Sequence, residues 1–197
     1  MPPFVNCVTV SRMLSPRAFL YLRHGETDWN LADRCQGQTD VPLNATGREQ
    51  ARRARDALAG VEIATICASP LARAYETAKV VAEAAGAPIV LIDDLKECSF
   101  GVREGDPIGA WHARWLSGTE IPERGESVGE FLARALRGIN AALERPGPVL
   151  IVAHRGVYRA VRGCVGNDDT GNLANCLPLS HLPPGEDEPG WRIRPIG

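Results

Sequence analysis

The chain has 197 residues, 44% of them hydrophobic and 23% charged, which is the composition of a globular protein with a substantial core. Its 22 basic and 24 acidic side chains give a formal net charge of −2, which argues against a protein that binds nucleic acid over its whole surface. Arginine supplies 20 of the 22 basic residues. Arginine suits bidentate recognition of phosphate, although compositional bias accounts for most of this excess.

The six cysteines form no CxxC pair and show no zinc-finger spacing, so we expect free thiols in a reducing cytoplasm. The first residues have neither the basic region nor the long apolar run of a signal peptide. No segment approaches the roughly 20 apolar residues of a membrane span, so no membrane association is expected. Residues 1–16 are interpreted as an N-terminal extension and residues 17–197 as a single domain, and nothing in the sequence specifies an oligomeric state.

From residue 18 onward, short apolar runs that predict strands alternate with segments that predict helices. Thr46 and Ser127 can cap helices, the latter with Glu130 in a capping box. Ser69-Pro70 has the order of a helix start, and Gly86 would end that helix. In chain order the predicted elements are a strand at 18–22, a helix at 46–58, a strand at 64–68, a helix at 69–86, a strand at 88–92, a short helix at 108–116, a helix at 127–143, a strand at 148–153 and a helix from about 157. Two further segments, at 175–182 and 191–196, complete the list.

Strands that are continuously apolar are covered on both faces, which predicts a three-layer α/β/α sandwich around a mostly parallel sheet. Residues 103–125 are expected to form a small cap region, and residues 183–190 a surface loop. In such sheets, ligands bind outside the carboxyl ends of the strands. His24 and His154 each come at the end of a predicted strand, so this edge is the predicted site.

The segment LRHGETDWN at residues 22–30 resembles the RHGE-T-x-x-N signature of the histidine phosphatase superfamily, the phosphoglycerate-mutase-like enzymes. Further segments match in the family's order and approximate spacing, so the resemblance spans most of the chain and implies the family's α/β fold. These segments are GQTDVPL at 37–43 with Gly47, SPLARAYET at 69–77, LKE at 95–97 with Gly101 and EG at 104–105, and VAH at 152–154.

The chemistry of these residues points to the same kind of site. A neutral imidazole accepts a phosphoryl group well, and a neighbouring cation such as Arg23 disfavours protonation of His24. A phosphoryl group in transit spreads its charge over its oxygens, so a pocket without a metal needs several fixed donors. The candidate donors are Arg23 and Arg73, which can form forked charge-assisted bonds, together with His154, Asn30 and Thr39.

The resemblance implies that His24 is the nucleophile, and that the phosphate is bound by Arg23, Asn30, Arg73 and His154. It also implies that Glu97 protonates the leaving oxygen and then activates water, a role for which the nearby Asp94 and Glu104 could compete. The sequence has no H-x-H, HExxH or clustered-carboxylate pattern, so neither a metal nor another cofactor is expected.

Two arginines depart from the family's usual pattern. Arg155 follows the second histidine where glycine is common, and Arg103 stands where tryptophan often precedes Glu-Gly. Each either contacts an anionic part of the substrate or is a solvated surface residue. Trp111 and Trp115 share one face of a predicted helix, where core packing is favoured over a lid that contacts substrate.

Cys67 and Arg73 have the C-x5-R spacing of cysteine-dependent phosphatases. Such a loop binds phosphate with successive backbone N–H groups, and Pro70 removes one of them. We therefore interpret this spacing as a coincidence.

These features predict a phosphomonoesterase that acts on a small molecule without a cofactor. One alternative is a mutase that returns the phosphoryl group to a bound sugar acid. Mutases of the family carry a longer, basic insertion between the acid/base glutamate and the second histidine, whereas residues 98–153 are compact and contain no lysine. The other alternative is a catalytically silent domain that binds a phospholigand, which would need neither a nucleophile nor an acid.

Overall fold

The computed structural model describes residues 14–166, 173–185 and 188–197. Most of the predicted N-terminal extension and the centre of the predicted loop at 183–190 lie outside these ranges. No helix in the described ranges is long and apolar enough to cross a membrane.

The described residues form a six-stranded sheet with the strand order β3-β2-β4-β1-β5-β6. The four strands from β3 to β1 are parallel to one another, while β5 and β6 extend the sheet in antiparallel fashion, which confirms the mostly parallel sheet. The strands are β1 (Phe19–Arg23), β2 (Thr65–Ala68), β3 (Ile89–Leu91), β4 (Val149–Ala153), β5 (Leu179–Leu182) and β6 (Arg192–Pro195).

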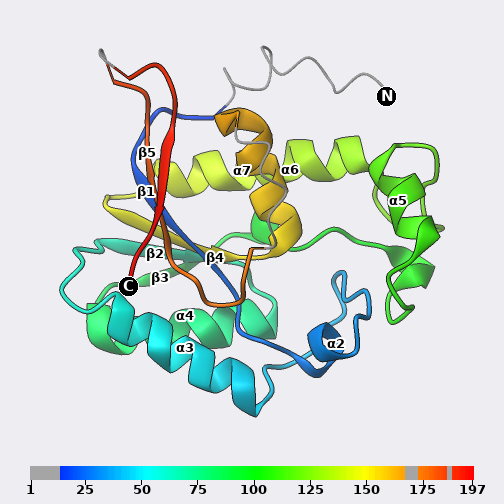
Figure 1. Ribbon diagram of the computed structural model, residues 1–197, viewed down its shortest axis with the longest axis horizontal. Coiled ribbons are helices and arrows are strands. Elements are labelled where there is room, and N and C mark those ends of the chain that lie inside the picture. The colour runs from blue at the N-terminus through cyan, green and yellow to red at the C-terminus, as the bar shows by residue number, and fades with distance from the viewer. Residues whose placement is uncertain (1–13, 167–172, 186–187) are drawn as a thin grey trace.

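Helices cover both faces of this sheet and give the three layers that the sequence predicts (Figure 1). The helices are α2 (Asp28–Leu31), α3 (Ala45–Ala57), α4 (Ala72–Ala85), α5 (Ala110–Leu116), α6 (Val128–Leu143) and α7 (Arg155–Val165), with 3-10 turns η1 (Asp93–Leu95) and η2 (Gly101–Arg103). Helices α3 and α4 lie on one face, and α6 and α7 on the other.

Alternation along the central strands divides the core in two. Phe19 and Tyr21 of β1 pack with α6 and α7, whereas Leu20 and Leu22 pack with α3 and α4. Successive side chains of a strand point to opposite faces, so a continuously apolar strand serves both layers. The site is therefore built where these buried strands end.

Two predicted helix starts are wrong, and side-chain hydrogen bonds explain both. The N-cap of α3 is Asn44, whose side chain accepts a hydrogen bond from the Gly47 N–H, rather than Thr46. Helix α4 begins at Ala72, and the Asp40 carboxylate, from a distant loop, accepts a hydrogen bond from its N–H at 2.6 Å. Ser69 does not cap this helix, because its backbone still pairs with β4 beyond the end of β2 and its hydroxyl contacts Nε2 of His154.

Other predicted boundaries are confirmed. Gly86 ends α4 with a left-handed φ of 63°, and Ser127 and Glu130 form the predicted capping box of α6.

Helix α7 begins at Arg155, two residues earlier than predicted, because His154 itself is its N-cap. This direct transition from β4 into α7 places His154 at the sheet edge and the N-terminus of α7 beside it.

Candidate active site

The two histidines of the sequence motifs meet at the carboxyl edge of the sheet. Strands β1 and β4 are parallel neighbours in which Arg23 is paired with Ala153, so His24 and His154 follow at adjacent strand ends. The His24 N–H donates to the Ala153 carbonyl, and the two imidazole rings lie 5.2 Å apart between centroids.

The His24 ring is buried, with 3% of the residue exposed, and its orientation is fixed. Its Nδ1 lies 2.7 Å from the Gly25 carbonyl oxygen, which can only accept, so Nδ1 carries the proton and Nε2 keeps a lone pair. Burial, Arg73 and Arg23 together hold the pKa of His24 well below its ordinary value. The imidazole is therefore neutral with its nucleophilic nitrogen unprotonated.

Glycines at positions 25 and 47 let the loop after β1 pack directly against the first turn of α3. A Cβ on Gly25 would lie 2.4 Å from the Gly47 carbonyl oxygen, and a Cβ on Gly47 would lie 2.1 Å from the Glu26 carbonyl oxygen. Neither position has space for a side chain, because the obstacle on each side is backbone. This close approach explains why both glycines belong to the motif segments.

Arg23 and Arg73 flank His24, and each is anchored by main-chain carbonyls. Arg23 donates to the Leu173 carbonyl at 2.7 Å, and Arg73 donates to the Gly37 and Thr39 carbonyls at 2.8 and 3.0 Å. Burial and then Arg155 lower the pKa of Arg23 to about 10, so the guanidinium remains charged near neutral pH. The Nε atoms of Arg23 and Arg73 are buried and have no hydrogen-bond partner among the described residues.

His154 is completely buried and held from two sides. The Tyr21 hydroxyl donates to its carbonyl at 2.7 Å, and its Nε2 lies 2.8 Å from the Ser69 hydroxyl. Its Nδ1 is buried without a partner among the described residues. Burial, Arg73 and His24 hold the pKa of His154 well below its ordinary value. His154 is not among the residues that line the cavity, but its ring is adjacent to that of His24, which does line it.

Glu97 is the one of the three candidate acid/base residues that reaches the cavity. Its two side-chain oxygens accept hydrogen bonds from the Cys98 and Gly156 N–H groups, each at 3.0 Å. Asp94 instead pairs with Arg137 at 3.3 Å, and Glu104 accepts hydrogen bonds from backbone N–H groups of residues 38, 39 and 100. Of the three competing carboxylates, Glu97 alone lines the cavity formed by the described residues.

A cavity of about 240 Å³ opens in front of His24. Six of the nine predicted site residues line it: Arg23, His24, Asn30, Arg73, Glu97 and Arg155. Asn30 belongs to α2, a helix turn that the sequence analysis missed, and it forms a reciprocal capping box with Thr27. That box fixes the Asn30 side chain at the cavity wall.

Thr39 and Arg103, two further predicted contacts, do not line this cavity. The Thr39 hydroxyl donates to Glu104, and its carbonyl accepts from Arg73. Arg103 forms ion pairs with Asp106 and Glu120 and lies over the Trp111 ring. Both side chains are therefore committed to nearby structural partners.

Several cavity residues were missed by the sequence analysis, including Arg159, His112 and Asn175. Arg159 follows Arg155 by four residues on α7, so helical spacing could have revealed it. Burial, Arg159 and Arg155 lower the pKa of His112 to about 4. Trp111 and Trp115 are buried in the core as favoured, and Trp115 also forms part of the cavity wall.

The C-x5-R spacing does not form a second phosphate site. The Cys67 thiol is buried toward α6, 3.9 Å from the Ala142 carbonyl, and burial raises its pKa to about 11. A thiol with such a pKa is a poor nucleophile near neutral pH. In the described ranges, no group of three or more histidine, cysteine or acidic residues could hold a metal ion.

Comparison with known proteins agrees with this geometry. The family model for the histidine phosphatase superfamily (branch 1) matches residues 19–175. A Bacillus subtilis (strain 168) protein named uncharacterized phosphatase PhoE is 37% identical over 184 residues, covering 90% of this chain and 92% of its own. A Yersinia enterocolitica protein named probable phosphoglycerate mutase GpmB is 37% identical over 145 residues, covering 68% of this chain and 67% of its own.

The solved structures include a mycobacterial glucosyl-3-phosphoglycerate phosphatase in complex with VO3, with a TM-score of 0.73 and 29% identity over 91% of this chain and 97% of that one. The chain belongs to the histidine phosphatase superfamily. This confirms the resemblance seen in the sequence motifs, the phosphoglycerate-mutase-like fold and the class of a histidine-dependent phosphomonoesterase.

Proposed function

We propose that this protein hydrolyses phosphomonoesters through a phosphohistidine on His24. The observation that carries the proposal is a set of buried nitrogens around that residue, on Arg23, Arg73 and His154, that have no hydrogen-bond partner in the part of the chain that the structure describes. A buried polar group left without a hydrogen bond costs roughly 1–3 kcal/mol. Phosphate oxygens would satisfy all three groups at once, and the two guanidinium charges favour a dianion.

In the first step, the Nε2 lone pair of His24 attacks phosphorus and forms the N–P bond. The P–O ester bond breaks, its electron pair goes to the leaving oxygen, and Glu97 supplies a proton to that oxygen. Arg23, Arg73 and Asn30, with Nδ1 of His154, would stabilise the charge on the three transferring oxygens. In the second step, Glu97 takes a proton from water, the water oxygen attacks phosphorus, and the N–P bond breaks to release inorganic phosphate and neutral His24.

Hydrolysis is favoured over mutase chemistry by the short interval between Glu97 and His154, which contains no lysine. The relative named as a phosphatase also covers 90% of this chain, against 68% for the relative named as a mutase. Isomerisation of 3-phosphoglycerate faster than release of free phosphate would reverse this assignment.

Arg155, one of the two candidate specificity residues, lines the cavity. We propose that it faces an anionic group of the substrate distant from the phosphate, while Arg103 has no such role. The glucosyl-3-phosphoglycerate named for one structural neighbour carries such a group, a carboxylate. Arg155→Gly should lower kcat/KM for 3-phosphoglycerate several-fold relative to glycerol 3-phosphate, which lacks the carboxylate. An unchanged ratio would remove Arg155 from the specificity determinants.

The proposed chemistry needs no metal, and the thiols of the described cysteines suit a reducing cytoplasm. The central experiment measures hydrolysis of 4-nitrophenyl phosphate by wild type and His24→Asn, with and without EDTA. We expect wild-type activity that EDTA does not reduce, loss of activity in His24→Asn, and an acid-labile phosphoenzyme in wild type alone. Full activity in His24→Asn would refute the proposal, and vanadate binding without turnover of any ester would instead support a silent binding domain.

A further inference from the structure

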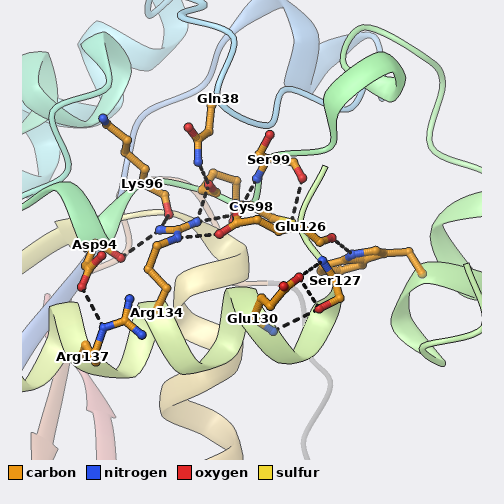
Figure 2. Close-up of polar contacts among 12 residues, drawn as sticks. Gln38, Asp94, Lys96, Cys98, Ser99, Glu126, Ser127, Glu130, Arg134 and Arg137 are labelled. Carbon is orange, nitrogen blue, oxygen red and sulfur yellow. Dashed lines mark hydrogen bonds and ion pairs between the residues drawn. The ribbon is translucent and has the colours of Figure 1, made fainter. Parts of the chain in front are cut away.

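The loop that carries Glu97 is held from behind by one arginine of α6. Arg134 donates from Nη1 to the Asp94 and Lys96 carbonyls, each at 3.0 Å, and from Nη2 to the Glu97 carbonyl at 3.1 Å. Figure 2 shows these bonds converging from the loop onto a single guanidinium. The carbonyls of Asp94, Lys96 and Glu97 are thereby all held by one planar guanidinium.

The other edge of the same guanidinium is held by Glu126. Its two carboxylate oxygens accept from Nε and Nη2 of Arg134, both at 2.7 Å, in a bidentate pair. Glu126 also accepts from the Ser99 N–H at 2.8 Å (Figure 2). The ion pair therefore holds main-chain groups on both sides of Cys98, namely the Glu97 carbonyl and the Ser99 N–H.

This pair is well defined and mostly buried, with 15% of the Arg134 side chain and 22% of the Glu126 side chain exposed. Although burial opposes both charges, their pairing raises the pKa of Arg134 and lowers that of Glu126. A buried ion pair contributes little net stability, but it can select one conformation among several. Lysine could not replace it, because an ammonium cannot span three carbonyls and a bidentate carboxylate.

We propose that Arg134 is a positioning residue for Glu97: it fixes the backbone of residues 94–97 so that the Glu97 carboxylate reaches the leaving oxygen of the substrate. The inference rests on the proposed role of Glu97 as general acid. Glu97 itself points to the cavity, and Arg134 lies on the opposite side of the loop, lining a surface groove with Lys96 and Ser99. Arg134 therefore acts through the loop and does not contact substrate.

Displacement of Glu97 should slow the hydrolysis of some phosphate esters more than that of others, depending on the leaving group. Glycerol 3-phosphate releases an alkoxide, which needs a proton from Glu97, whereas 4-nitrophenyl phosphate releases a phenolate that is stable without one. We expect kcat/KM of Arg134→Lys and Arg134→Ala to fall about 100-fold for glycerol 3-phosphate and less than about 5-fold for 4-nitrophenyl phosphate. The ratio of kcat/KM is the informative quantity, because it reports the step in which the ester bond breaks.

Arg137→Ala is the matched control. Arg137 lies on the same helix, is 64% exposed, and pairs with the Asp94 side chain rather than with the loop carbonyls. Its removal should leave the ratio of the two substrates within about twofold of wild type, since exposed ion pairs contribute little.

Chemical rescue gives an independent readout. Because Arg134 lines a surface groove, guanidinium at low millimolar concentration should reach the space left in Arg134→Ala and restore hydrolysis of glycerol 3-phosphate, whereas methylammonium should not. If Arg134→Ala does not fold, the substrate ratio of Arg134→Lys decides. Equal losses on both substrates in a folded variant, or a wild-type ratio, would overturn the inference. Failure of the proposed function would differ, because wild type would then hydrolyse neither ester.

Discussion

The Ser69 hydroxyl lies 2.8 Å from Nε2 of His154, at the ends of the neighbouring parallel strands β2 and β4. The Ser69 oxygen also accepts from the Leu71 N–H at 3.3 Å, and we infer that its own proton is donated to Nε2. His154 would then carry its own proton on Nδ1, the buried nitrogen that has no partner within residues 14–166, 173–185 and 188–197. On this inference, a serine that has the sequence pattern of a helix cap sets the tautomer of a site histidine.

Removing that hydroxyl should weaken oxyanion binding. Ser69→Ala leaves His154 free to adopt the other tautomer, so we expect the dissociation constant for vanadate to rise about tenfold and kcat/KM to fall by a similar factor, as for other orienting partners of site histidines. Isothermal titration and steady-state kinetics measure the two effects. Unchanged vanadate affinity in a folded variant would show that Ser69 does not orient His154.

Arg73 is expected to resist conservative replacement. Its guanidinium bridges the Gly37 and Thr39 carbonyls while Nε remains available for phosphate. Lysine keeps the charge but not this fork, so Arg73→Lys should lose roughly 100-fold or more in kcat/KM. Arg48→Lys, in an exposed ion pair with Glu76, is the control and should stay within about twofold. Near-wild-type activity in Arg73→Lys would remove Arg73 from the proposed phosphate site.

The protonation state of His24 can be observed directly. Burial, Arg73 and Arg23 hold its pKa well below the ordinary value, so the ring should remain neutral, with the proton on Nδ1, as the pH falls from 7.5 through 6. Long-range ¹H–¹⁵N spectra of the histidine rings distinguish the tautomers. Arg73→Gln should raise the His24 pKa, because one positive neighbour is lost. A proton on Nε2 in neutral wild type would contradict the assigned nucleophile.

Gly156 offers a second way to move Glu97. A Cβ at this position would lie 2.0 Å from the Glu97 Oε1 atom, so Gly156→Ala should displace the carboxylate and reduce kcat/KM for glycerol 3-phosphate at least tenfold. Gly163 lies on the same helix, and a Cβ there meets nothing within 4 Å. Gly163→Ala should keep full activity and raise the free energy of unfolding by about 0.5–1 kcal/mol. Equal activities of the two variants would refute this role of Gly156.

Stability should fall on mild acidification because a histidine is buried in its neutral form. Burial lowers the pKa of His181 to about 4, while an unfolded histidine titrates near about 6.5. The unfolded state therefore takes up a proton first as the pH drops below 6.5, and by pH 5 this favours unfolding by about 2 kcal/mol.

Above the pKa of histidine in the unfolded chain, about 6.5, His181 causes no such loss of stability. Urea denaturation at pH 7.5 and pH 5 measures it in wild type and in His181→Gln, which lacks the titrating ring that stacks on Phe19 and bonds Tyr158. The variant should be less stable at pH 7.5 but should lose about 2 kcal/mol less than wild type on acidification. An equal loss in both proteins would assign the acid sensitivity to other groups.

The sequence predicted the order of strands and helices because each buried strand is a short apolar run and several helices carry local capping signals. The prediction was wrong at two helix starts. At α3 the capping side chain is Asn44, which was not recognised in place of Thr46. At α4, predicted to start at Ser69, the first N–H is bound by Asp40 from a distant loop. Residues near each other in the chain can signal a cap, but a partner supplied by tertiary contact leaves no local pattern.

By itself, the sequence determined the family, the sheet with helices on both faces and the identity of the central histidines, since these depend on residue type and spacing. Only the tertiary structure decided that Glu97 reaches the cavity while Asp94 and Glu104 do not, and that Arg155 and Arg159 line it while Arg103 pairs elsewhere. The physical reason is that side-chain direction at a loop depends on which main-chain groups hold it. For the Glu97 loop those groups meet a guanidinium from α6, nearly forty residues away in the chain.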